Sequence, residues 1–254
     1  MSDHIEAERG NGQVLLASTA GRVPAARLGI AVVKDLVTAV VTGSVQPGDT
    51  LPPESVLIQQ FAVSRTVVRE SVKRLEEKGL VTVSQGRGTI VNSPSRWNVL
   101  DPDVLSALVD NDESLEILDE LAVVRASLEA SMAAAAAERQ TDVSSADLRR
   151  MHETAETALN DMDAYNDADA AFHDMIMEQS GNRLAANITR ILFARAREST
   201  RFTGTQGLDA VRTTLEEHRA IMEAVISGDA DGAAEAMSTH ITQAWHRRRP
   251  GTTR

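Results

Sequence analysis

Four side chains in the second half of the chain have the types and spacing of a metal site. Asp169 and His173 lie four residues apart in a segment with helical periodicity, so they share one face of a helix. His218 and His240 lie eleven residues before and eleven residues after a turn near Asp229. At about 1.5 Å of rise per residue, both histidines have the same height in an antiparallel helical hairpin and can face each other.

Three imidazoles and one carboxylate form a ligand set for zinc, with nickel, manganese and iron as alternatives. Each residue taken singly is more often an ordinary core or surface side chain, so purely structural histidines remain an alternative. A metal-dependent enzyme is a second alternative, because such sets with an open position also catalyse reactions. No nucleophile motif and no separate general base accompany the set. A fourth histidine, His152, is expected on an exposed helix face.

Composition limits what kind of protein can carry these residues. The 254 residues are enough for two domains, and the absence of cysteine excludes disulfides, thiolate metal sites and a cysteine nucleophile. The chain has no early apolar run of signal-peptide type and none of transmembrane length. We therefore expect a soluble cytoplasmic protein with no membrane partner.

The segment that carries the four side chains predicts a bundle of helices. It has no proline from Asp103 to Arg249 and is rich in Ala, Leu, Glu and Arg. Its periodicity predicts helices near 113–139, 144–160, 163–180, 182–203, 208–227 and 230–247. The expected fold class is therefore mainly α, with an all-α antiparallel bundle after an N-terminal module of different composition.

That N-terminal module predicts a helix-turn-helix. Residues 24–96 hold nine Lys and Arg against six Asp and Glu, although the whole chain has a net charge of −11. A helical stripe ends at Gly43, a short helix "ESVLIQQFAV" follows, and Ser64 is a suitable N-cap for "RTVVRESVKRLEEKGL". Arg65, Arg69 and Lys73 make a basic stripe on this last helix.

Such a helix can enter the DNA major groove, where arginine pairs with guanine and Ser64 and Thr66 can donate to phosphates. The alternative is a solvated basic face. The next segment, "VTVSQGRGTIV", alternates, turns at Gly86-Arg87-Gly88 and alternates again. It predicts a hairpin with Arg87 at its tip, so the module is expected to be a winged helix with the tip near a minor groove or phosphate.

The stretch "GDTLPPESVLIQQFAVSRTVVRESVKRLEEKGLVTVSQGRGTIV" resembles the winged-helix head of the GntR family of transcriptional regulators. The resemblance implies that Arg65, Arg69 and Gly86 contact operator DNA, with Ser64 and Thr66 in support. Many relatives have a DNA-binding arginine directly after "P-x-E", where this chain has Ser55. The operator sequence or its affinity is therefore expected to differ.

The remaining chain resembles the FCD domain, the effector-binding half of FadR-type GntR regulators. The resemblance rests on "VVRASLEASMAAAAAER", "DADAAFHDMIMEQSGN" and "EEHRAIMEAVISGDADGAAEAMSTHI" in that order. The Trp97-Asn98 pair and "LDPDVL" resemble the linker of a sugar-acid branch, whose best-known member represses galactonate catabolism.

The FCD resemblance implies a metal held by Asp169, His173, His218 and His240, and an effector carboxylate held by Arg125. A guanidinium fork suits a carboxylate, although an ion pair with Glu129 one turn later is an alternative that can coexist. Asn182 matches a common family position and is expected mainly at a helix boundary, with pocket contact as a lesser alternative.

Together these features predict a homodimeric regulator, not an enzyme. It would bind a near-palindromic operator and release it when a sugar acid or hydroxy acid binds beside a divalent metal. The expected units are a flexible extension (1–23), a winged helix-turn-helix (24–93), a linker (94–112) and an FCD bundle (113–249).

Overall fold

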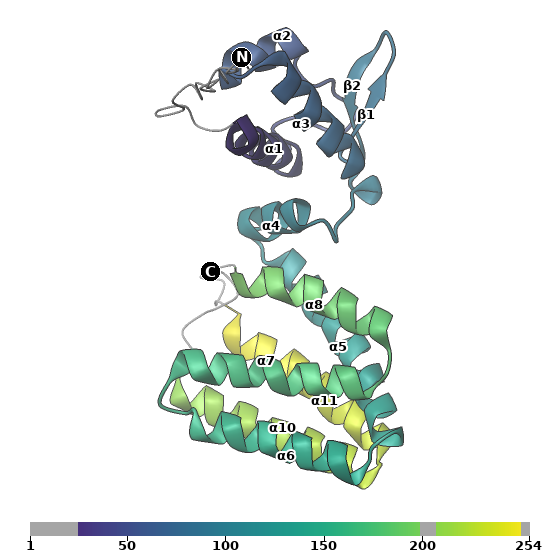
Figure 1. The fold of residues 1–254 in the computed structure, drawn as a ribbon, viewed down its shortest axis with the longest axis vertical. Coiled ribbons are helices and arrows are strands. Elements are labelled where there is room, and N and C mark those ends of the chain that lie inside the picture. Colours follow the sequence, from purple (N-terminus) through teal and green to yellow (C-terminus); the bar gives the residue numbers. More distant parts are fainter. Residues whose placement is uncertain (1–24, 199–206, 250–254) are drawn as a thin grey trace, which may run out of the picture.

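The computed structural model describes residues 25–198 and 207–249 (Figure 1). The expected flexible extension and the end of the helix expected over 182–203 therefore lie wholly or partly outside the described residues. The first module consists of three helices and a two-stranded hairpin: α1 (Ala25–Val41), α2 (Glu54–Phe61), α3 (Arg65–Glu77), β1 (Val81–Ser84) and β2 (Gly88–Val91). This is the predicted winged helix-turn-helix.

Local sequence sets the two ends of α3. The Ser64 hydroxyl accepts a hydrogen bond from the Val67 amide at 3.3 Å, which caps the first turn. Ala62, with φ of 51°, makes the sharp turn from α2 into α3. Gly79, with φ of 74°, follows the end of α3 in a left-handed conformation that favours glycine. A Cβ atom at this position would collide with the Arg96 carbonyl oxygen.

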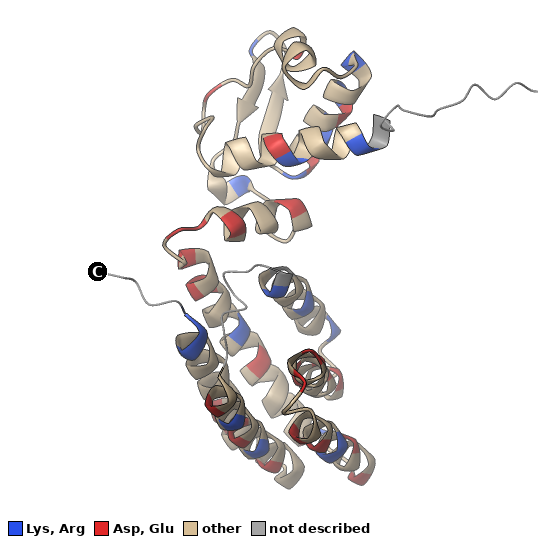
Figure 2. Ribbon diagram, turned by 90° about the vertical axis from the view of Figure 1, so that its left-hand side faces the viewer, with Lys and Arg blue, Asp and Glu red and all other residues tan. Residues whose placement is uncertain are grey.

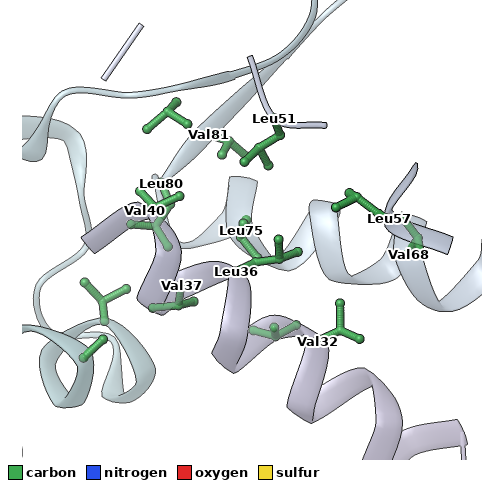
Figure 3. Close-up of a cluster of buried hydrophobic side chains, with 14 of the residues drawn as sticks. Val32, Leu36, Val37, Val40, Leu51, Leu57, Val68, Leu75, Leu80 and Val81 are labelled. Carbon is green, nitrogen blue, oxygen red and sulfur yellow. The ribbon is translucent and has the colours of Figure 1, made fainter. Parts of the chain in front are cut away.

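A single apolar core holds the head together (Figure 3). Residues of α1, α2, α3 and the hairpin converge in it, including Leu36, Leu57, Leu75 and Val81. The strands pair antiparallel, with Val81 opposite Val91 and Ser84 opposite Gly88. This packing fixes both the direction of α3 and the position of the hairpin relative to it.

The segment expected as a linker contains a short turn, η1 (Pro94–Arg96), and a helix, α4 (Pro102–Asn111), that lies between head and body (Figures 1 and 2). One face of α4 places Val104 in the core of the head. The opposite face places Leu105 and Val109 in a core of the body. This role was not predicted from the sequence, although the ten-residue helix carries apolar side chains on both faces.

Lys78, just after α3, ties the head to the start of α4. Its Nζ lies 2.7 Å from both carboxylate oxygens of Asp101, which also caps α4, and 2.8 Å from Asp103 Oδ2. Burial opposes the charge on Lys78, but the hydrogen bonds to both aspartates outweigh it and raise its pKa.

Replacing Lys78 with Met is expected to lower the free energy of unfolding by about 1–2 kcal/mol, because Asp101 loses its partner. The corresponding fall in melting temperature is roughly 2–8 °C. Since folding raises the pKa of Lys78, the wild-type advantage is present below the unfolded pKa and is lost only as pH rises through the folded one. Lys73→Met is the control, because Lys73 is exposed and 3.8 Å from Glu77. Equal melting temperatures for wild type and Lys78→Met would contradict the prediction.

The body is a bundle of helices, as predicted from its periodicity. The described helices are α5 (Glu116–Glu138), α6 (Asp142–Thr157), α7 (Met162–Gln179), α8 (Arg183–Glu198), α10 (Leu208–Ser227) and α11 (Ala230–Arg248). The alanine run on α5 packs closely against α11 and α10, with Ala133, Ala136 and Met237 in one buried cluster. No helix among the described residues is both long and apolar enough to cross a membrane.

Candidate metal centre and nucleic-acid interface

Three histidines from three helices meet inside the body. His173 lies on α7, His218 on α10 and His240 on α11, and all three are buried. Nε2 of His240 is 3.3 Å from Nε2 of His218 and 3.3 Å from Nε2 of His173. One ligand atom from each lies within 4.8 Å of the others, which makes the group able to hold a metal ion. The structure thus brings together histidines that are far apart in sequence.

The spacing of these nitrogens fits a bound cation. Two zinc–nitrogen bonds of about 2.0–2.1 Å at a tetrahedral angle separate the nitrogens by roughly 3.3 Å. Nδ1 of His173 and Nδ1 of His240 each face a carboxylate, which assigns the proton to Nδ1 and the lone pair to Nε2. Two lone pairs would then face each other at 3.3 Å, and a cation between them removes that repulsion.

Asp169 lies beside this group, one turn before His173. Its Oδ1 is 3.7 Å from Nε2 of His218, so it stands at the edge of the three-histidine group. This oxygen is buried and has no hydrogen-bond partner among the described residues; the same holds for Nδ1 of His218. Unpartnered buried polar atoms are costly, so both atoms fit a site that a ligand completes.

Two carboxylates that sequence analysis did not assign to the site hold the histidines in place. Glu129 Oε2 is 2.7 Å from Nδ1 of His173, and Glu217 Oε2 is 2.8 Å from Nδ1 of His240. Burial opposes ionisation of both, but nearby positive charge and hydrogen bonds outweigh it and lower each pKa to about 2. The only sequence signals were that Glu217 precedes His218 and that Glu129 is one turn from Arg125.

Burial also decides the charge state of the histidines. It lowers the pKa of His218 well below the ordinary value, and the neighbouring His240 and His173 add to the effect. It likewise lowers the pKa of His240, despite the hydrogen bond with Glu217. At neutral pH both rings are therefore neutral, which is the form that binds metals.

Arg125 on α5 is buried beside the same group. Its Nε donates to Glu129 Oε1 at 2.7 Å, so the ion pair expected as an alternative is present. Its guanidinium lies 3.7 Å above the centre of the Phe193 ring, a contact that sequence analysis missed. Within residues 25–198 and 207–249, no hydrogen bond occupies the two terminal nitrogens of Arg125, which leaves them for a ligand.

His152 is not on the surface: it is 3% exposed, and its Nε2 lies 3.0 Å from the Leu215 carbonyl oxygen. The prediction was wrong because α6 packs on α10 with the His152 face inward, next to Phe172.

Asn182 is exposed and caps α8, where its Oδ1 accepts a hydrogen bond from the Ala185 amide at 3.1 Å. No described contact links Asn182 to the three histidines.

The expected DNA-contacting residues gather on α3 and the hairpin. Arg65, Thr66, Arg69 and Lys73 are exposed on α3, and Gly86 and Arg87 are exposed at the tip of the hairpin, where Gly86 has φ of 80°. The Ser64 hydroxyl is engaged in capping α3. A groove of about 540 Å³ separates α3 from the hairpin, and Arg69, Lys73 and Thr89 line it.

Glu54, at the start of α2, was not predicted to belong to this surface. Nε of Arg69 lies 3.0 Å from Glu54 Oε1 and 3.1 Å from Oε2. Both side chains are largely exposed, so this ion pair adds little stability. It does hold the Arg69 side chain beside the start of α2.

Known proteins resemble both parts of the chain. The sequence model described as "Bacterial regulatory proteins, gntR family" matches residues 29–91, and that of the FCD domain matches residues 120–243. The chain is 31% identical over 215 residues to the galactonate operon transcriptional repressor of Escherichia coli K12, covering 82% of this chain and 91% of the repressor. It is 30% identical over 211 residues to the transcriptional regulator LutR of Bacillus subtilis, covering 79% of this chain and 91% of LutR.

The fold also resembles solved structures. The structure of Lar, from a study of the Listeria monocytogenes agr system, aligns over 87% of this chain and 96% of Lar with a TM-score of 0.55. Sequence identity in that alignment is 18%, so the likeness concerns the fold alone.

Proposed function

The chain belongs to the GntR family of bacterial transcriptional regulators and carries an FCD domain, and we propose that it represses genes until a small carboxylate binds beside a divalent metal. The matched relatives are transcriptional regulators, so DNA binding and not catalysis is its function. The observation that carries the sensing proposal is the group of three inward-facing Nε2 atoms next to Arg125.

In this proposal α3 enters the major groove of the operator. Arg65 and Arg69 contact base edges, while Ser64, Thr66 and Lys73 contact the backbone. Gly86 lets the hairpin tip approach the DNA closely, and Arg87 reaches a phosphate or the minor groove. The exposure of these side chains on one surface supports the assignment.

The metal is proposed to be zinc, with nickel, manganese or iron as alternatives, held by His173, His218, His240 and Asp169. When bound, it supplies an open position for a carboxylate or α-hydroxyl oxygen. Arg125 then takes the same carboxylate in a bidentate pair through its terminal nitrogens. Glu129 orients both Arg125 and His173, because its carboxylate contacts Arg125 Nε and His173 Nδ1. The name of the galactonate operon repressor makes sugar acids one ligand class to test.

A homodimer is proposed to place two heads on a near-palindromic operator. The outer faces of α5 and α8, which pack side by side, present Val123, Val124, Leu184 and Ile191 to solvent; Val123 is 67% and Leu184 73% exposed. No exposed charge interrupts the α5 face between Val123 and Ala135. Such a contiguous uncharged surface fits a second copy of the chain.

Replacing Val123 and Leu184 with Asp is expected to convert the dimer to a monomer, because two charges per subunit would be buried without partners. Light scattering coupled to size-exclusion chromatography gives the mass. Val143→Asp is the matched control, since Val143 is 73% exposed on α6, away from this face. A double variant that remains dimeric would place the interface elsewhere.

Helix α4 supplies a route from the body to the head, because it contributes side chains to a core on each side. An effector that binds one arrangement of the body more tightly would shift α4, and with it the spacing of the two heads.

Selection from a random pool of DNA duplexes, followed by fluorescence anisotropy, tests the whole proposal. We expect a near-palindromic site whose affinity falls when both metal and a hydroxy or sugar acid are added. Metal alone should have little effect. If the selected DNA sites contain no inverted repeat, recognition by a dimer is contradicted. If no combination of metal and acid changes the affinity for DNA, carboxylate sensing is contradicted.

A further inference from the structure

An ion pair joins the two helices of the helix-turn-helix. Glu54 is the first residue of α2, and Arg69 lies one turn into α3. Both carboxylate oxygens of Glu54 accept from Arg69 Nε, at 3.0 and 3.1 Å. The pair adds little stability because it is largely exposed, but both residues line the groove between α3 and the hairpin. Its effect is therefore expected in DNA binding.

The backbone that carries each partner is held firmly. Leu51 and Leu57 lie three residues before and three residues after Glu54, and both point into the apolar core of the head (Figure 3). The Leu51 amide also donates to a carbonyl oxygen of β2 at 2.8 Å. Val68, directly before Arg69, is fully buried in the same core. The carboxylate of Glu54 is thus presented to α3 from a fixed position.

The contact engages one N–H group of Arg69 and leaves the rest of the guanidinium for another partner. Nε has a single N–H, while the two terminal nitrogens have four. Within residues 25–198 and 207–249, no hydrogen bond or ion pair engages a terminal nitrogen of Arg69. Arginine recognises guanine through two hydrogen bonds to O6 and N7. With Nε held by Glu54, the guanidinium plane is oriented before DNA arrives, so less side-chain freedom is lost on binding.

We propose that Glu54 is a positioning residue that presents the terminal nitrogens of Arg69 to a guanine and keeps Arg69 away from the phosphates. The inference rests on the proposed function, in which Arg69 contacts a base edge. If Arg69 turned to a phosphate, the Glu54 carboxylate would be left unpaired close to the negative DNA backbone. Glu54 therefore opposes sequence-independent contacts more than the base contact. It raises the ratio of operator affinity to non-specific affinity, although its own charge weakens binding to any DNA.

A purely structural role for Glu54 predicts a different result. An acidic residue in the first turn of a helix interacts favourably with the helix dipole, and α2 has no side-chain cap from Pro53. Glu54→Asp separates the two roles, because it keeps the charge in the first turn but shortens the side chain by one methylene. If Glu54 positions Arg69, the Asp variant should bind DNA like Glu54→Gln. If it only stabilises α2, the Asp variant should bind DNA like wild type.

Fluorescence anisotropy gives the ratio, using the duplex that the wild-type chain selects from a random pool and a scrambled duplex of the same composition. Glu54→Gln is expected to lower the ratio about 5- to 30-fold per dimer. Non-specific affinity should rise and depend more steeply on salt, because Arg69 becomes available to a phosphate. Glu70→Gln is the matched control, since Glu70 is exposed next to Arg69 on α3 and the change removes the same charge. In this control the ratio should stay within about twofold of wild type.

A double variant shows whether Glu54 acts through Arg69. Once Arg69 is replaced with Ala, a residue that only positions it has nothing left to orient. Adding Glu54→Gln to Arg69→Ala should therefore change the ratio by less than about twofold. An equal loss in both backgrounds would mean that Glu54 acts on α2 or contacts a base itself, and would overturn the proposal. An unchanged ratio in the single variant Glu54→Gln would overturn it as well.

The outcomes separate this inference from the proposed function. If Arg69→Ala keeps wild-type operator affinity, base contact by Arg69 is wrong and the role of Glu54 falls with it. If Arg69→Ala weakens operator binding but Glu54→Gln leaves the ratio unchanged, only the role of Glu54 is wrong. Repeating the selection with Glu54→Gln should return the same inverted repeat with a relaxed preference for one guanine in each half-site. Full retention of every guanine would contradict the proposal.

Discussion

His240→Ala is expected to lower the affinity for zinc by more than about 100-fold. His240 is the middle ligand of the group, since its Nε2 lies 3.3 Å from those of both His173 and His218. Loss of a partner outside the metal's own ligands typically costs 10- to 100-fold in metal affinity, and loss of a ligand costs more. The substitution also leaves Glu217 without its hydrogen bond from His240.

Competition with a chromophoric chelator measures the affinity directly. Zinc at about 100 times its dissociation constant should stabilise wild type by roughly 2.7 kcal/mol, and this gain should vanish in the variant. His246→Ala is the matched control, because His246 is exposed on the same helix. Glu217→Gln should fall between the two. Unchanged zinc affinity in His240→Ala would mean that the histidines are structural.

Arg69→Ala is expected to weaken operator binding by about 2–6 kcal/mol per dimer, since each subunit loses a base contact worth roughly 1–3 kcal/mol. The exposed Glu54 carboxylate, 3.0 Å from Arg69 Nε in the wild type, would be left unpaired near DNA phosphates and add repulsion. Affinity for non-specific DNA should fall much less. The ratio of operator affinity to non-specific affinity should therefore fall as well.

Anisotropy at fixed salt, with specific and scrambled duplexes, provides the comparison. Arg74→Ala is the control, because Arg74 is exposed in the last turn of the same helix. Metal and acid binding should be unchanged in both variants. Wild-type operator affinity in Arg69→Ala would remove α3 from the proposed base-reading surface.

The sequence predicted those parts of the fold whose signals are local. Ser64 marks the start of α3, and the two glycines around Arg87 mark the hairpin. The equal spacing of His218 and His240 from their turn predicted that they can meet. Each helix rises by a constant distance per residue, so both histidines lie at the same height in an antiparallel hairpin. These inferences need only periodicity and helix geometry.

The parts that could not be predicted depend on which helices pack together. His152 is buried because of the angle between α6 and α10, which no single helix encodes. Glu129 and Phe193 join the candidate site from α5 and α8, and their types are compatible with many surroundings. The contact of α4 with both cores could not be predicted for the same reason, because apolar residues on a helix do not show which other helices they pack against.

The position of α4 has a practical consequence for building hybrid sensors from this chain. A fusion that joins a foreign head or foreign body at the boundary before Pro102 or after Asn111 gives α4 to one parent. Val104 or the pair Leu105 and Val109 would then face a surface that evolved with a different helix. Functional hybrids therefore need α4 redesigned residue by residue, with one face taken from each parent and Lys78 kept together with Asp101.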